Sequence, residues 1–104
     1  MTVPQTRPAT TKRLLDQALA ELLDTVDRRD PLDSAIVSAV EGAALIAQAA
    51  EEAGLDDGEG KAVELAKEAL GAMRASVIAA TVSVRTLADR RRERAATESV
   101  SRKV

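Results

Sequence analysis

The stretch KAVELAKEALGAMRASVIAATVSVRTLADRRRER, residues 61–94, decides the fold because its apolar residues recur at alternating intervals of three and four. This spacing fills the a and d positions of four successive heptads without a proline, which predicts one long helix of about 50 Å. The apolar seam of this helix consists of Val63, Ala66, Leu70, Met73, Val77, Ala80, Val84 and Leu87. The remaining chain is too short both to cover this seam and to build a core of its own. We therefore expect a homo-oligomer.

The composition favours helices that pack closely over small side chains. The chain has 104 residues, enough for one domain, and 45% of them are hydrophobic, but it contains no Phe, Tyr or Trp. Ala, Leu, Val and Ile must form the core, because the side chains that bury the most area are missing. These features predict an all-α fold with an N-terminal helix, a long antiparallel helical hairpin and coiled-coil-like oligomerisation.

Turn and capping residues divide the chain into three predicted helices, at about residues 11–27, 31–53 and 58–94. A disordered basic arm is expected over residues 1–9, and a disordered polar tail over residues 95–104. If the second helix lies along the third, it reaches only as far as about residue 83. The expected oligomer interface is therefore the distal part of the seam, formed by Val77, Ala80, Val84 and Leu87.

Helix-start signals precede the first two predicted helices. Thr10 or Thr11 supplies an N-cap for the first helix. Asp30 followed by Pro31 starts the second, because proline at the first helical position loses no hydrogen bond and an aspartate oxygen accepts from the free amides. These signals support the predicted boundaries at both helices.

The turn between the second and third helices contains glycine and acidic residues. Gly54 fits the left-handed position just past a helix, and Asp56 or Asp57 can cap the third helix. The β-branched residues in the segment 77–84 also allow a strand, but the heptad pattern continues through it and favours a helix. The predicted core face of the second helix consists of Leu32, Ile36, Ala39, Val40, Ala43, Ala47 and Ala50.

Several classes of chemistry are disfavoured by the residues that the chain lacks. It has no Cys and no His, which removes disulfides, thiolate metal sites and the commonest general base. The acidic run Asp56, Asp57, Glu59 lacks the ligand spacing of an EF-hand calcium loop, and no glycine-rich nucleotide-binding motif is present. We expect no enzymatic activity, no cofactor and no bound metal.

The sequence also carries an expectation about location. The N-terminus shows no positively charged segment followed by an apolar stretch, and no apolar run approaches the roughly 20 residues that span a bilayer. We expect a soluble cytoplasmic protein that does not bind membranes.

Charge is distributed unevenly along the chain. Residues 1–13 carry three positive charges and no negative ones, residues 14–60 carry two positive and twelve negative, and residues 61–104 carry ten positive and five negative. The basic ends suit contacts with DNA phosphates, which are blind to sequence and sensitive to salt, or pairing with the acidic middle of a neighbouring subunit. The candidate DNA-contacting residues are Arg7, Lys12, Arg13, Arg90, Arg91, Arg92 and Arg94.

Two further functions remain open at this stage. Residues 49–55 imitate the turn of a helix-turn-helix regulator, although the following helix would begin with acidic residues that repel phosphates. The acidic hairpin could instead bind a helix of another protein, as an adaptor. DNA binding that weakens with salt separates a DNA-binding protein from an adaptor.

The order of these parts resembles the small terminase subunits of actinobacterial phages and prophages. The resemblance covers residues 6–74 and rests on a basic arm (PATTKRLLDQAL), an acidic hinge with an Asp-Pro helix start (RRDPLDSAIVSAV) and an Ala-rich hairpin (ALIAQAAEEAGLDDGEGKAVELAKEAL). It implies a ring-shaped homo-oligomer that recognises double-stranded viral DNA for packaging in the host cytoplasm and delivers it to a large terminase subunit. Larger members carry an N-terminal helix-turn-helix that this sequence lacks, so the resemblance does not identify the DNA-contacting element.

Overall fold

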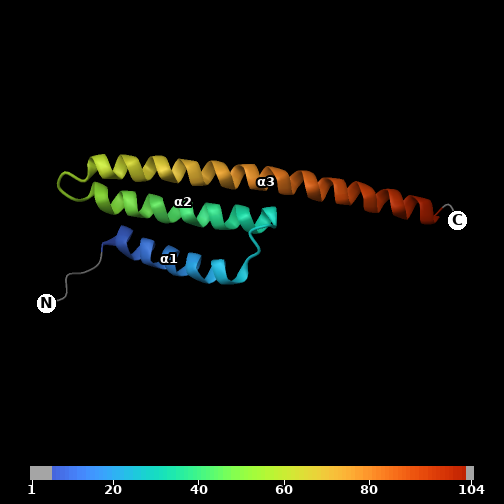
Figure 1. Ribbon diagram of the computed structural model, residues 1–104, viewed down its shortest axis with the longest axis horizontal. Helices are drawn as coiled ribbons and strands as arrows, with labels where there is room; N and C mark the ends of the chain where they lie inside the picture. The colour runs from blue at the N-terminus through green and yellow to red at the C-terminus, as the bar shows by residue number, and fades with distance from the viewer. Residues whose placement is uncertain (1–5, 103–104) are drawn as a thin grey trace.

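Three α-helices form the chain, as a computed structural model that describes residues 6–102 shows (Figure 1). They are α1 at Arg7–Thr25, α2 at Pro31–Ala53 and α3 at Glu59–Arg102. Residues 6–102 contain no strand, so the predicted all-α class is confirmed. The β-branched segment 77–84 lies inside α3, as its heptad pattern indicates.

The first helix begins earlier than the sequence predicts. Thr6 is its N-cap, and the Thr6 hydroxyl accepts a hydrogen bond from the main-chain amide of Ala9 at 3.3 Å. The predicted caps, Thr10 and Thr11, lie inside α1. Pro8 sits in the first turn, where its missing amide removes no helical hydrogen bond. Residues 7–9 of the predicted disordered arm are therefore helical, whereas residues 1–5 lie outside the described part.

The predicted start of α2 is confirmed. The Asp30 carboxylate accepts a hydrogen bond from the amide of Leu32 at 2.9 Å, and Pro31 is the first helical residue. The carboxylate of Asp33, in the first turn, accepts from the amide of Asp27 at 3.0 Å. These two bonds fix the path of the chain between α1 and α2.

The turn before α3 differs from the prediction. Gly54 is right-handed, with φ −80°, and Asp57 takes the left-handed conformation instead, with φ 60°. Aspartate tolerates this region better than most residues. Glycine is needed at position 58, because a Cβ there would lie 1.9 Å from the main-chain oxygen of Glu52. Gly58 directly precedes α3, and its carbonyl oxygen accepts a hydrogen bond from the amide of Ala62 at 2.9 Å. Gly58 therefore occupies the cap position that the sequence assigned to Asp56 or Asp57.

The third helix continues past the predicted end at residue 94. Residues 95–102, expected to be a disordered tail, extend α3 to Arg102. The segment after Arg94 begins with two alanines and contains no glycine or proline, so nothing in its backbone chemistry ends the helix. The prediction relied on the polar composition of this segment, which removes a packing partner but not the helical hydrogen bonds.

The three helices form one flat layer with α2 in the middle (Figure 1). The molecule measures 76 × 28 × 19 Å, and within the described residues α1 contacts α2 but not α3. α2 and α3 run in opposite directions, in contact over small side chains. The Ser76 hydroxyl donates to the carbonyl of Ala35, and Met73 packs against Gly42. The core is thin, because Val37 is the only large side chain with under 2% exposure within the described part of the chain.

The face of α3 that meets α2 is not the predicted seam. The buried residues of α3 are Ala62, Ala69 and Ser83, each one position before a seam residue. In contrast, Val63 is 52% exposed and Leu70 is 55% exposed. Small side chains permit a closer helix approach than valine and leucine do, so α2 packs on the small-residue face and leaves the seam open.

The predicted core face of α2 is also largely open. Leu32 and Ile36 are each 47% exposed, and Ala50 is exposed too. α2 instead buries Ala35, Val37, Ser38, Gly42, Ala44 and Ala47, which face the helices on either side. Of the predicted set, only Ala47 is buried. A helix between two neighbours in a flat layer must present its remaining face to solvent.

Among the described residues, one helix is long and apolar enough to cross a membrane, judged by length and composition only. α2 has 23 residues and an 18-residue window with a mean hydropathy of 1.3. Length and composition alone are weak evidence of a membrane span, because the central helix of a soluble protein meets the same criteria. Here α2 is flanked on two sides by other helices of the chain.

Candidate DNA-contact and assembly surfaces

The four clustered arginines lie where α3 extends beyond the rest of the molecule. Every residue from 91 to 100 is exposed, and no other helix runs beside this end (Figure 1). Arg90, Arg91, Arg92 and Arg94 occupy little more than one helical turn, so their side chains project in several directions around the helix. This arrangement forms a basic collar on a free helix end.

Most of the positive charge of this collar is uncompensated within the chain. Arg92 contacts Asp89 at 3.4 Å, an exposed i, i+3 pair. Among the described side chains, Arg90, Arg91 and Arg94 form no ion pair within 4 Å. An exposed ion pair such as Arg92–Asp89 contributes little to stability and is screened by salt. Arg92 therefore also remains accessible to an anion.

The second group of predicted DNA-contacting residues lies at the other end of the molecule. Arg7, Lys12 and Arg13 are in the first half of α1, beside the α2–α3 turn and far from the free end of α3 (Figure 1). The hydrogen bond and ion pair with Asp16 raise the pKa of Lys12, which is therefore engaged within its own helix. A single chain does not bring the two basic groups together.

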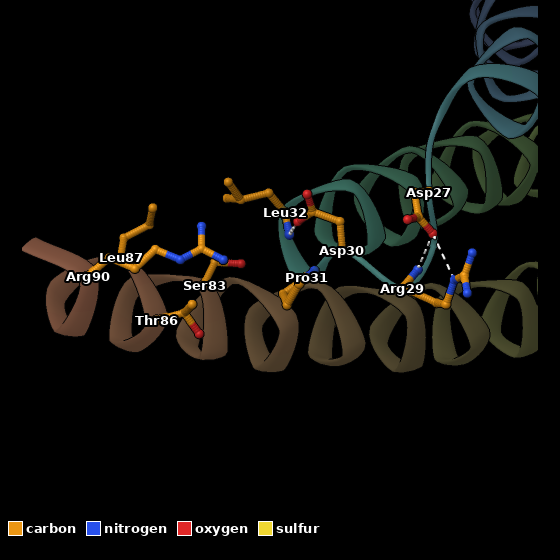
Figure 2. A pocket seen from close by; sticks show the side chains of 9 residues that line it. All are labelled: Asp27, Arg29, Asp30, Pro31, Leu32, Ser83, Thr86, Leu87 and Arg90. Atoms are coloured by element: carbon orange, nitrogen blue, oxygen red, sulfur yellow. Dashed lines mark hydrogen bonds and ion pairs between the residues drawn. The ribbon is translucent and has the colours of Figure 1, made fainter.

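A pocket lies at the corner where α2 begins beside α3 (Figure 2). Its volume is about 300 Å³, and Arg90 and Leu87 line its α3 side, opposite Asp30 and Leu32. Its acidic groups have local partners. Asp27 accepts from the main-chain amide and the guanidinium of Arg29 at 3.0 and 3.4 Å, and Asp30 caps α2. The pocket therefore offers no unpaired buried polar group to a ligand.

The acidic turn does not form a metal site within the described residues. No group of three or more Asp or Glu side chains there is arranged to hold a metal ion. Asp56, Asp57 and Glu59 project from a turn whose geometry is set by Gly58. The turn is therefore a cluster of solvated negative charge.

The predicted oligomer interface is accessible. Val77 is 65% exposed, Val84 66% and Leu87 49%, and Ala80 is exposed as well. Around Val77, a shallow apolar groove of about 360 Å³ runs along α3. The groove is lined by Leu70, Met73, Arg74, Val77 and Ile78.

Sequence analysis missed the contribution of α2 to this exposed surface. Leu32, Ile36 and Ile46 are about half exposed; Leu32 and Ile36 belong to the predicted core face of this helix, whereas Ile46 does not. Their spacing of four and ten residues places them on one helical face, so the signal was present. For Leu32 and Ile36 the prediction assigned this face to the core of the chain, because an amphipathic pattern shows that a face is to be buried but not what buries it.

Comparisons with known proteins add no relative. No protein-family model matches the chain, and neither a curated protein nor a solved structure matches it. The proposed function therefore rests on the fold, the basic collar and the exposed apolar residues of α3.

Proposed function

We propose that this chain is a non-enzymatic DNA-binding component that contacts the duplex backbone through the basic collar of α3. The observation that supports this proposal is the placement of four arginines on a helix end that no other part of the chain covers. Arginine forms bidentate contacts with phosphate, and a free helix end can approach a duplex without steric hindrance. Arg7, Lys12 and Arg13 supply further positive charge.

Contacts of this kind recognise the backbone and not the bases. The chain has no aromatic side chain that could stack on a single strand. Each arginine that neutralises a phosphate releases counterions, so affinity falls steeply as salt rises. The proposal therefore predicts sequence-tolerant binding to duplex DNA.

In this proposal the chain works as a coiled-coil-like homo-oligomer of helical hairpins, joined through Val77, Ala80, Val84 and Leu87. The exposure of these residues supports it. The small-terminase interpretation gives the assembly a role: it would bind viral DNA in the host cytoplasm and present it to a large terminase-like subunit.

A salt titration of DNA binding tests this function. Fluorescence anisotropy would follow a labelled 30-base-pair duplex with the wild-type chain and with R90A/R91A/R92A/R94A, from 50 to 300 mM salt. We expect the variant to lose affinity by at least about tenfold at low salt and to show a smaller salt slope. A matched control, R28A/R29A/K61A/K67A, changes net charge equally away from the collar and should bind almost as the wild type does. Equal losses in both variants, or none in the collar variant, would overturn the proposal.

A second candidate function is a protein-interaction adaptor, which the exposed apolar residues of α2 and α3 favour. It predicts no duplex binding at any salt concentration. The helix-turn-helix alternative receives no support from the arrangement of α2 and α3. Helices of that motif cross at about 90–120°, whereas α2 and α3 lie side by side along the length of α2 (Figure 1).

A further inference from the structure

We propose that a second copy of this chain packs face to face on the layer, antiparallel to the first, through one continuous apolar face that α2 and α3 form together. This inference rests on the self-association in the proposed function and goes further, because it specifies the surface, the partner and its direction. The apolar face consists of Leu32, Ile36, Ala39, Ala43, Ile46 and Ala50 of α2 and Val63, Leu70, Val77 and Val84 of α3.

Helix geometry places both sets on the same side of the layer. Ser76 contacts Ala35 across the two helices. Each residue is rotated by 100° around the helix axis from the one before it. When two antiparallel helices touch at a pair of residues, the next residue of each helix therefore lies on the same side of the layer. Ile36 and Val77 are those next residues, and they are 47% and 65% exposed.

The same register holds along the whole contact between α2 and α3. The contact of Gly42 with Met73 and the ion pair of Lys61 with Glu52 at 3.2 Å agree with it to within one helical turn. Ala43 therefore lies level with Leu70. The two exposed stripes run side by side for the length of α2.

The opposite side of the layer is more polar, although Val82 is 45% exposed there. Glu41 and Glu52 of α2 lie there, with ion pairs to Arg28 at 3.5 Å and to Lys61 at 3.2 Å. By contrast, none of the ten residues of the apolar face is charged, and Lys67 and Arg74 lie beside it. A single solvated layer has no reason to be apolar on one side alone, so this difference indicates a buried side.

The exposed area has the size that a second copy would cover. The chain exposes 7989 Å². A compact monomer of 11.0 kDa exposes about 5,600 Å², so the excess is about 2,400 Å², part of which is the free end of α3. Obligate interfaces bury about 1,000–2,500 Å² on each partner. Two layers stacked on their apolar faces would also form the two-layer core that a domain normally requires.

The seam of α3 is compatible with the antiparallel direction, and the distribution of charge favours it. It runs from Val63 to Leu87, so a two-fold axis level with Ala75 aligns Val63 of one copy with Leu87 of the other and Leu70 with Ala80. Every seam residue then meets a seam residue of the second copy. A parallel copy would superpose like charges instead, with acidic turn beside acidic turn and collar beside collar.

The antiparallel copy also matches opposite charges. Arg91 continues the seam beyond Leu87, and the two-fold axis lays it beside Glu59 of the second copy, while Arg94 comes toward the acidic turn that precedes α3 of that copy. These pairs are exposed and screened by salt, so all four arginines of the collar remain accessible to DNA phosphates. Each end of the dimer then carries the collar of one copy and the basic start of α1 of the other, two groups that a single chain keeps apart (Figure 1).

The first test is the absolute mass in solution, by size-exclusion chromatography with light scattering and refractive-index detection. We expect a dimer or an even multiple of it for the wild type. V77E should weaken the dimer by about 100-fold or more, because it brings two carboxylates into an apolar interface. The substitution is tolerable in the isolated layer, since Val77 is exposed and glutamate is the better helix former.

A75E is the matched control. Ala75 is exposed on the same helix but faces away from the apolar face, and the substitution adds the same charge. It should leave the dimer intact. Circular dichroism should show equal helix content in both variants at a concentration where both are soluble. A wild-type monomer at 100 μM, or equal effects of V77E and A75E, would overturn the inference.

The second test measures direction. The chain has no cysteine, so A95C and A75C each accept a single nitroxide label. In the antiparallel dimer, the two labels at residue 95 should lie about 60 Å apart, because each lies about 30 Å along α3 from the two-fold axis, in opposite directions. Labels at residue 75 should lie roughly 20–30 Å apart in either direction, which shows that the dimer is present. A short distance at residue 95 would overturn the antiparallel arrangement.

Two further outcomes separate this inference from its rivals. A monomer that binds neutral lipid vesicles through Val77 would assign the apolar face to a membrane and overturn the dimer. A stable antiparallel dimer that does not bind duplex DNA would overturn the proposed DNA contact and leave the assembly intact. Failure of the dimer and failure of DNA binding are therefore distinguishable.

Discussion

The side-chain hydroxyl of Ser76 in α3 donates a hydrogen bond to the main-chain carbonyl of Ala35 in α2, with 2.8 Å between the two oxygens. The bond joins residues 41 positions apart and lies partly buried in the contact between the two helices. We expect S76A to lower the free energy of unfolding by about 1 kcal/mol, the usual net contribution of such a bond. Urea unfolding followed by circular dichroism at 222 nm measures this, since the chain has no Trp or Tyr.

Ser83 provides the control for that substitution. It is 4% exposed, and its hydroxyl donates to the carbonyl of Ala79, within the same helix, at 2.9 Å. Because alanine has the higher helix propensity, S83A should change stability by less than about 0.5 kcal/mol. Equal losses of stability in S76A and S83A would show that the bond between the helices stabilises the fold no more than the bond within α3 does.

Glycine substitutions should separate backbone crowding from helix propensity. At Gly71 an added Cβ meets nothing within 4 Å, so G71A should stabilise the chain by about 0.5–1 kcal/mol. At Gly58 the Cβ would lie 1.9 Å from the Glu52 carbonyl oxygen, so G58A should destabilise it by about 2 kcal/mol or more. Thermal unfolding of the two variants checks the opposite signs. A stabilising G58A would contradict the close approach at the turn.

Sequence patterns predicted the helices better than they predicted the packing. Asp30 and Pro31 fixed the start of α2, because this cap depends only on local backbone chemistry. The contact between α2 and α3 depends instead on which of two adjacent faces packs more closely. Seam residues such as Val77 and small residues such as Ser76 differ by one position, so both faces follow the same periodicity.

The two candidate sites also differ in how well the sequence predicts them. The arginine collar could be found from the sequence as a charge cluster, and its exposure follows from the length of α3 beyond α2. The apolar face could not be placed from the sequence, because Ile36 and Val77 become neighbours only through the register between the two helices. That register is fixed by contacts between small residues, which carry little signal in a sequence.

The ion pair of Lys12 with Asp16 predicts a pH dependence with a definite sign. The hydrogen bond to Asp16 is the main cause of the raised pKa of Lys12, so the pair stabilises the folded state below the ordinary lysine pKa of 10.5. This contribution is lost as pH rises above 10.5 through the raised pKa. An NMR titration should show a higher Lys12 pKa in the wild type than in D16N. Equal values in the two proteins would contradict the bond.

The N-cap of α2 provides the sharpest test of local structure. The Asp30 side chain accepts the amide of Leu32 at 2.9 Å, so D30A should cost about 1 kcal/mol, within the usual range of about 0.5–2 kcal/mol. D30N keeps an acceptor oxygen and removes the charge. If the cap bond dominates, D30N should unfold within about 0.3 kcal/mol of the wild type. If the helix dipole dominates, D30N should instead resemble D30A. We expect the first result in urea unfolding at two salt concentrations, because salt screens the dipole interaction but not the hydrogen bond.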